Sequence, residues 1–221
     1  MSNYYTESKV EVKGFAARHY DALMNIITFG RYKPFIEEAI KSMGIRPNDR
    51  ILDLGTGTGR NACLMMKYLS KQGELIGTDI SVEMISQFKK KCADFPNAKI
   101  IYARVYQPLP FEEKFDKIFI SFVLHGFPQA IRETVINNAY KALNKDGEFY
   151  ILDWNEFDLN ALPFHQRAFF RLIECPYAFD FIRRDWKKIL ASHNFNGFEE
   201  YFFFKGFARL LKAKKLYSHE I

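Results

Sequence analysis

Cysteine is scarce in this chain, and its three cysteines fit no common metal or disulfide motif. Cys63, Cys92 and Cys175 are far apart in the sequence and include no C-x-x-C pair. We therefore expect neither a zinc site nor a disulfide framework, and this composition fits a reducing, cytoplasmic environment. The five histidines show no ligand-like spacing, so we expect no metal.

A long apolar run is also missing. The longest one, IFISFVL at residues 118–124, is far shorter than the roughly 20 residues that cross a bilayer as a helix. The first residues, MSNYYTESKVEVKG, are polar and lack the apolar centre of a secretory signal peptide. We expect residues 1–14 to be a mobile lead, and any membrane contact to be peripheral, at the inner face.

Acidic side chains are fewer than basic ones, with 26 Asp and Glu against 32 Lys and Arg. Basic residues gather at residues 89–91 and again at 205–215. Such clusters can meet nucleic acid or an anionic membrane, although a short lysine run is more often a solvated helix face. The 23 Phe residues fit a Phe-rich core, or else an apolar pocket or a surface that meets lipid.

From residue 45 onward, short apolar runs alternate with helical patterns, which is typical of a parallel sheet covered on both faces. The expected strands are 50–55, 73–79, 98–103, 115–124, 197–204 and 207–215, and residues 145–154 are expected to form a turn followed by the fifth strand. The sequence therefore predicts one α/β domain over residues 15–221, with a doubly wound, mostly parallel seven-stranded sheet and a C-terminal antiparallel hairpin. Helices are expected at 15–45, before the sheet, and at 155–195, as a cover over the binding site.

The run ILDLGTGTGR at residues 51–60 places a glycine-rich turn directly after the first strand. Ligands of doubly wound sheets bind beyond the carboxyl ends of the strands. Gly55, Gly57 and Gly59 would let the turn take positive φ and let a ligand approach the backbone. Their G-x-G-x-G spacing differs from the G-x-G-x-x-G of dinucleotide sites, which argues against a dehydrogenase and favours a nucleoside without a pyrophosphate.

Two carboxylates flank this turn. Asp79 ends the second strand in GTDIS, where a carboxylate can accept both ribose hydroxyls of an adenosine. Asp79 could instead cap the next helix, but Ser81 already supplies a cap. Asp53 lies two residues before Gly55 and either contacts the ligand or braces the loop.

Together, LDLGTGTG, GTDIS and LNKDGEFYILDW resemble the motifs of class I S-adenosylmethionine-dependent methyltransferases, over roughly residues 15–212. The resemblance implies that S-adenosyl-L-methionine is the cofactor and S-adenosyl-L-homocysteine the product. The further cofactor contacts that it implies are Tyr20, Thr56, Thr58, Ile80, Met84, Val105, Tyr106 and Ser121.

A narrower resemblance connects the chain with the ubiquinone/menaquinone-biosynthesis C-methyltransferases, which methylate a ring carbon of a prenylated quinol. The similar segments are HYDALMNIITFGRYK, LPFEEKFDKIFISFVLHGF and KGFARLLKAKK. Val105 and Tyr106 stand where that family has Asp-Ala, so the adenine would depend on backbone groups and aromatic stacking. His125 stands within Leu-His-Gly where the family has Leu-Arg-Asn, at the place of the acceptor.

His125 is our candidate catalytic residue, because the loop after the fourth strand faces the methyl group in this fold. A neutral imidazole there could take a phenolic proton and so enrich the neighbouring ring carbon in electrons. His125 could equally brace the loop. Asp153 and Trp154 could line the acceptor pocket, or Asp153 could cap the next helix. Cys175 is interpreted as a packing residue.

The sequence therefore predicts an S-adenosylmethionine-dependent methyltransferase acting on a small aromatic acceptor, with a prenylated quinol as the leading candidate. Methylation of another small molecule at oxygen or nitrogen is the first alternative. A nucleic-acid methyltransferase ranks lower, because the chain has neither the Asn/Asp-Pro-Pro-aromatic motif nor a Pro-Cys pair, so no nucleic-acid partner is expected. A non-catalytic cofactor-binding domain is the last alternative. The oligomeric state stays open, with a homodimer among the options.

Overall fold

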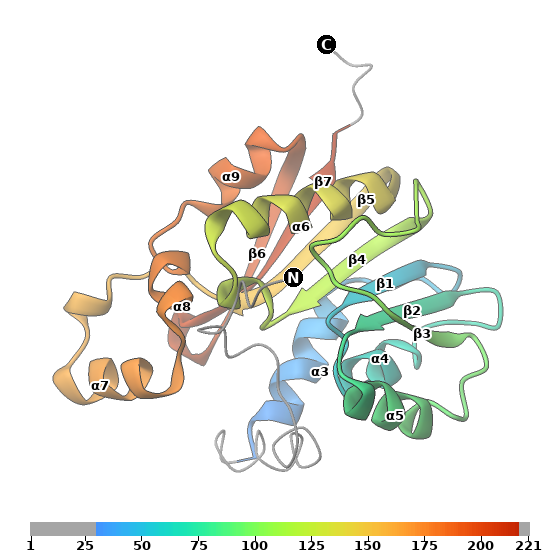
Figure 1. The fold of residues 1–221 in the computed structure, drawn as a ribbon, viewed down its shortest axis with the longest axis horizontal. Helices are drawn as coiled ribbons and strands as arrows, with labels where there is room; N and C mark the ends of the chain where they lie inside the picture. The colour runs from blue at the N-terminus through green and yellow to red at the C-terminus, as the bar shows by residue number, and fades with distance from the viewer. Residues whose placement is uncertain (1–29, 217–221) are drawn as a thin grey trace.

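The computed structural model describes residues 30–216, and the expected lead and first helix lie outside them. A seven-stranded sheet in the order β3-β2-β1-β4-β5-β7-β6 runs through the centre (Figure 1). The strands are β1 Arg50–Leu54, β2 Glu74–Asp79, β3 Ala98–Tyr102, β4 Phe115–Ser121, β5 Leu143–Trp154, β6 Phe195–Phe203 and β7 Ala208–Lys215. The first five are parallel, and β7 is antiparallel to both β5 and β6. The predicted fold class is confirmed.

Helices cover both faces of the sheet (Figure 1). They are α3 Tyr32–Ser42, α4 Arg60–Met65, α5 Val82–Lys91, α6 Gln129–Ala142, α7 Phe164–Ile173, α8 Pro176–Phe181 and α9 Trp186–Ser192, with 3₁₀ turns η1 Leu124–Gly126, η2 Leu159–Ala161 and η3 Phe204–Gly206. In β1, Leu52 and Leu54 join the apolar core under α6, α8 and α9, whereas Ile51 joins the core under α3, α4 and α5. Both faces of β1 are therefore buried, which explains why the neighbouring residues Ile51 and Leu52 are both apolar.

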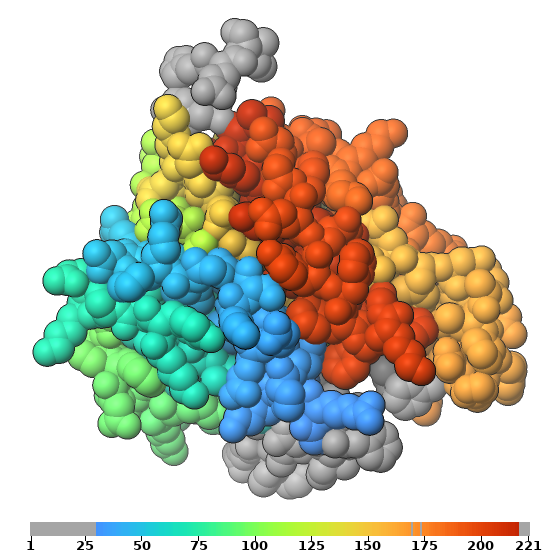
Figure 2. Space-filling model, turned by 180° about the vertical axis from the view of Figure 1, so that it is seen from behind, coloured from blue at the N-terminus to red at the C-terminus, as the bar shows by residue number. Residues whose placement is uncertain are grey.

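The carboxyl-terminal hairpin packs against α3 on the rear face (Figure 2). The ring of Phe35 in α3 lies 4.9 Å from that of Phe203 and 4.8 Å from that of Phe204 between their centroids. Part of the Phe excess therefore lies in the core. Within residues 30–216, no helix combines the length and apolar character needed to cross a membrane.

Two expectations need correction. We expected a turn at the start of the fifth strand, but β5 already begins at Leu143. The turn residue Asp146 keeps a positive φ of 61°, and the pairing of β4 with β5 shifts register between Phe115 and Lys117. The expected turn is thus part of the strand, where it causes a register shift like that of a β-bulge.

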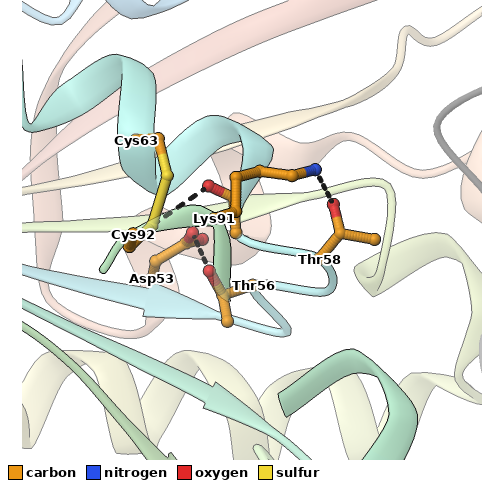
Figure 3. Close-up of a disulfide and its surroundings, with 7 residues drawn as sticks. Asp53, Thr56, Thr58, Cys63, Lys91 and Cys92 are labelled. Carbon is orange, nitrogen blue, oxygen red and sulfur yellow. Dashed lines mark hydrogen bonds between the residues drawn. A yellow bond between two sulfur atoms is a disulfide. The ribbon is translucent and has the colours of Figure 1, made fainter. Parts of the chain in front are cut away.

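The second correction concerns cysteine. Cys63 in α4 and Cys92 after α5 form a disulfide, with Cα atoms 5.8 Å apart (Figure 3). Their 29-residue separation concealed the fact that α4 and α5 pack against each other. Because disulfides persist in oxidising surroundings, cysteine usage no longer supports the expected reducing compartment. Cys175 is free and buried, which agrees with a packing role.

Candidate functional site

A cleft of about 440 Å³ opens at the carboxyl ends of β1, β2, β3 and β4, where ligands of doubly wound sheets bind. Its volume is within the range of small-molecule sites. Most of the expected cofactor contacts lie on its wall: Gly55, Thr56, Gly57, Thr58, Asp79, Ile80, Met84, Val105, Tyr106 and Ser121. Asp53 and Gly59 do not line it, and Tyr20 lies outside the described residues.

The three glycines of the loop serve different purposes. All have positive φ, at 72° for Gly55, 59° for Gly57 and 80° for Gly59. A Cβ on Gly55 would lie 2.7 Å from the side chain of Val123, and one on Gly59 would lie 2.7 Å from the ring of Phe88. At Gly57 nothing lies within 4 Å of that position. Close approach by protein side chains thus explains Gly55 and Gly59, and only Gly57 opens onto free space.

Asp79 connects β2 to the glycine loop and also faces the cleft. Its Oδ1 accepts hydrogen bonds from the backbone N–H groups of Ile80 and Ser81, both at 2.8 Å. Its Oδ2 accepts one from the N–H of Gly57 at 2.9 Å. Ser81 is the N-cap of α5, as expected, and accepts from the N–H of Met84. Because Asp79 also lines the cleft, its carboxylate is part of the wall that a ligand would meet.

Asp53 braces the loop from behind. It is 1% exposed, and its Oδ2 accepts a hydrogen bond from the Thr56 hydroxyl at 2.6 Å (Figure 3). Burial raises the pKa of Asp53 to about 7, although the Thr56 hydroxyl opposes this shift. Of the two roles considered for Asp53, this geometry favours the brace.

Tyr32, Arg60 and Asn61 are among the cleft-wall residues that we did not single out from the sequence. The guanidinium of Arg60 lies 5.0 Å from the ring centroid of Tyr32, which brings α3 to the start of α4. The side-chain Oδ1 of Asn61 is buried and has no hydrogen-bond partner within residues 30–216. A buried unpaired acceptor on a cleft wall is a site for a ligand donor. Asn61 lies two residues after Gly59, and this position at the start of α4 could have indicated it from the sequence.

Aromatic side chains lie in and behind the cleft wall around Phe122, which we call the aromatic end of the cleft. Phe122 lines it and has a positive φ of 51°, a strained backbone state that is common at functional sites. Its ring contacts Trp154 edge-on, at 5.8 Å between centroids, and Trp154 contacts Phe170 of α7 at 5.3 Å. The buried Nε1 of Trp154 has no partner among the described residues.

His125 lies beside Phe122, does not line the cleft, and has carboxylates at both ring nitrogens. Nδ1 is 2.7 Å from Oδ1 of Asp153, and Nε2 is 3.3 Å from Oε2 of Glu174. Burial disfavours the charged ring, but these two carboxylates outweigh it and raise the pKa of His125. The arrangement therefore disfavours the neutral imidazole that we expected at neutral pH.

Arg132 of α6 was not singled out from the sequence, yet it organises this region. Its side chain is fully buried and donates to the carboxylate of Asp180 and the carbonyl of Tyr177, both at 2.6 Å. It also donates to the carbonyls of Leu124 and His125, at 3.2 and 3.1 Å. One cation thus fastens α8 to η1.

Comparison with known proteins identifies the family. The family model described as a methyltransferase domain matches residues 45–195. The demethylmenaquinone methyltransferases of several Staphylococcus aureus strains are 34% identical over 113 residues, which cover 51% of this chain and 46% of theirs. The chain thus matches about half the length of these relatives.

Solved structures agree in fold. An S-adenosylmethionine-dependent methyltransferase from Aquifex aeolicus superposes with a TM-score of 0.62 at 16% identity, over 82% of this chain and 89% of the other. A chain from the complex of the Haloferax volcanii Trm112 methyltransferase activator with a methyltransferase gives 0.73 at 14% identity, over 93% and 97%. The chain therefore belongs to the methyltransferase domain family and has the fold of S-adenosylmethionine-dependent methyltransferases.

Proposed function

We propose that this protein binds S-adenosylmethionine in the cleft and transfers its methyl group to a ring carbon of a prenylated aromatic quinol. The choice of cofactor is supported by the family, the fold and the fit of the cleft wall. The choice of acceptor is supported by the similarity to demethylmenaquinone methyltransferases, which covers about half of either chain. It is also supported by the aromatic end of the cleft.

The cleft wall offers a partner for each part of the cofactor. Asp79 lies on the wall where its carboxylate can meet the ribose, and Gly57 leaves room for the nucleoside against bare backbone. The unpaired Oδ1 of Asn61 can accept from the ammonium of the methionine moiety. Met84 and Tyr106 provide apolar surface for the adenine. When bound, the cofactor supplies a methyl group already activated on a sulfonium, so the protein chiefly positions the acceptor.

One observation carries the aromatic acceptor: Phe122 lines the cleft and is backed by Trp154, whose buried Nε1 lacks a partner within the described chain. Aromatic rings prefer edge-on or offset contact with other rings. Trp154 itself does not line the cleft, so the contact with the acceptor ring falls to Phe122. A prenylated acceptor resides in a bilayer, so we also place the protein peripherally at the inner face of a membrane.

We keep His125 as the proposed base, with a condition set by its surroundings. Only the neutral imidazole can take a phenolic proton, and Asp153 and Glu174 favour the charged form. If His125 is the base, the rate will rise with pH through its raised pKa, and His125→Asn will lower kcat by about a hundredfold or more at high pH. If His125 is only a brace, kcat will change in step with stability and the pH profile will keep its shape.

Methyl transfer with an isotopically labelled methyl group tests the acceptor. Purified protein is incubated with the labelled cofactor and, separately, with a short-chain prenylated naphthoquinol, the same quinol without the prenyl group, a catechol and an aromatic amine. We expect label on the ring carbon of the prenylated quinol, identified by mass spectrometry. Label only on oxygen, on nitrogen or on a water-soluble compound would overturn the quinol assignment and leave the methyltransferase assignment intact.

A further inference from the structure

Helix α7 presents an apolar stripe to solvent. Phe164 is 78% exposed and Leu172 is 76% exposed, whereas most large apolar side chains of the described chain are at least partly buried. These two residues and the exposed Ala168 are spaced by four, so they share one face of the helix. In Figure 2 the segment forms a light-orange lobe at the edge of the molecule, and Figure 1 places α7 at the outer end of the fold.

The opposite face of α7 is anchored, so the stripe has a fixed outward direction. Phe170 is 6% exposed, and its ring contacts those of Trp154, Phe157 and Phe179 at centroid distances of 5.3 to 5.6 Å. These contacts attach α7 to the aromatic end of the cleft. A helix so attached can bring the cleft close to whatever surface its outer face binds.

The charges of α7 have one sign. Arg167 and Arg171 lie beside the stripe, His165 lies on its other side, and α7 contains no acidic residue. Neither arginine forms an ion pair with another residue of the 30–216 range. The acid that follows the helix, Glu174, is directed to His125 instead. An apolar stripe flanked by arginines is the pattern of helices that lie in the interface of an anionic bilayer.

We propose that α7 docks this protein on an anionic phospholipid surface, with Phe164 and Leu172 inserted among the acyl chains and Arg167 and Arg171 contacting phosphate groups. The purpose of docking, delivery of a lipid-borne acceptor to the cleft, rests on the proposed function, but the binding itself requires no turnover. The alternative occupant of this face is α7 of a second copy of the chain. Symmetric pairing of two α7 helices would place arginines opposite arginines, because α7 contains no acidic residue.

Co-sedimentation of the full chain with vesicles tests the proposal. Vesicles of phosphatidylcholine mixed with phosphatidylglycerol should bind the protein, and vesicles of phosphatidylcholine alone should bind it more weakly. The pair Phe164→Ser and Leu172→Ser should weaken binding by at least about tenfold, since each side chain loses its apolar transfer. The pair Arg167→Glu and Arg171→Glu should weaken it about tenfold and abolish its dependence on salt.

Matched controls lie elsewhere on the surface: Tyr68→Ser for the apolar change, and Lys67→Glu with Lys71→Glu for the charge change, all at exposed positions of the α4 region or just after it. The controls should bind vesicles like the wild type. Circular dichroism and Tm should show all variants folded, because Phe164, Arg171 and Leu172 are exposed and Arg167 is half-buried.

Equal binding of the α7 variants and the wild type would overturn the proposal, as would vesicle-independent dimerisation that is lost in the serine pair. Vesicle binding through α7 without methylation of any quinol would sustain docking and reject the proposed acceptor. Methylation of a detergent-dispersed quinol by a protein that binds no vesicles would support the proposed acceptor and reject docking.

Discussion

The cofactor side and the acceptor side of the site that we propose are constructed differently. On the cofactor side, the wall consists of the glycine loop and the end of β2, where Asp79 accepts three backbone hydrogen bonds. On the acceptor side, charged side chains from distant segments meet: His125 with Asp153, 28 residues away, and Arg132 with Asp180, 48 residues away. The first side depends on main-chain conformation, and the second depends on buried charges that must remain paired.

This difference implies different sensitivities. Removal of one partner from a buried charged group leaves the other uncompensated, which is strongly destabilising. A change in the glycine loop instead alters the shape presented to a ligand. We therefore expect substitutions on the acceptor side to act first on stability, and those on the cofactor side to act first on binding.

The largest effect is expected for Arg132→Ala. This substitution removes the guanidinium that donates to the carbonyls of Leu124, His125 and Tyr177, and it leaves Asp180 with one cation fewer. The free energy of unfolding should therefore fall by about 3 to 5 kcal/mol. Arg184→Ala is the control, because Arg184 also pairs with Asp180 but is 40% exposed. This control should change the free energy of unfolding by about 1 kcal/mol or less. Urea unfolding measures both. Equal effects would remove the distinction between buried and exposed charge.

The next effect tests the cofactor side. Loss of the Cys63–Cys92 bond, by reduction or by substitution of both residues with serine, should lower stability by about 3 kcal/mol, or Tm by about 6 to 12 °C. Cys175→Ser is the control for loss of a thiol and should leave the response to reductant intact. A Tm that is insensitive to reductant in the wild type would contradict the bond. The bond links α4 to α5 beside the glycine loop. Its loss should therefore also weaken the binding of S-adenosylhomocysteine.

A smaller effect is expected for the pH dependence of stability, which should involve His125 on the acceptor side. The folded pKa of His125 is raised, so its stabilising contribution is complete below the unfolded value near 6.5 and is lost as the pH rises through the folded pKa. His125→Asn should therefore lower stability by about 2 kcal/mol at pH 6 and by less at pH 9. His193→Asn, at the half-buried end of α9, is the control for the loss of an imidazole elsewhere in the chain. A Tm difference for His125→Asn that grows with pH would contradict the pairing with Asp153 and Glu174.

The sequence predicted most of the residues that line the cleft around the glycine loop, because their signals are local. Gly57, Asp79 and Ser81 lie within short contiguous segments whose residue types carry the backbone requirement. The acceptor side was predicted only in outline, since nothing near Arg132 reveals that Asp180 will lie beside it. The disulfide escaped for the same reason: helix packing, not spacing, brings Cys63 to Cys92. The sequence left two roles open for Asp53, and only its hydrogen bond with Thr56 favours the brace over a ligand contact.

The most direct test of the account is equilibrium binding of S-adenosylhomocysteine by calorimetry. The wild type should bind it, and Asp79→Ala should weaken Kd by at least about tenfold, since hydrogen bonds to a carboxylate contribute about 1.5 to 3 kcal/mol each. Asp53→Asn, which keeps an acceptor for Thr56 and does not line the cleft, should bind nearly as well as the wild type. Absence of binding to the wild type, or an unchanged Kd in a folded Asp79→Ala protein, would contradict the placement of the cofactor in this cleft.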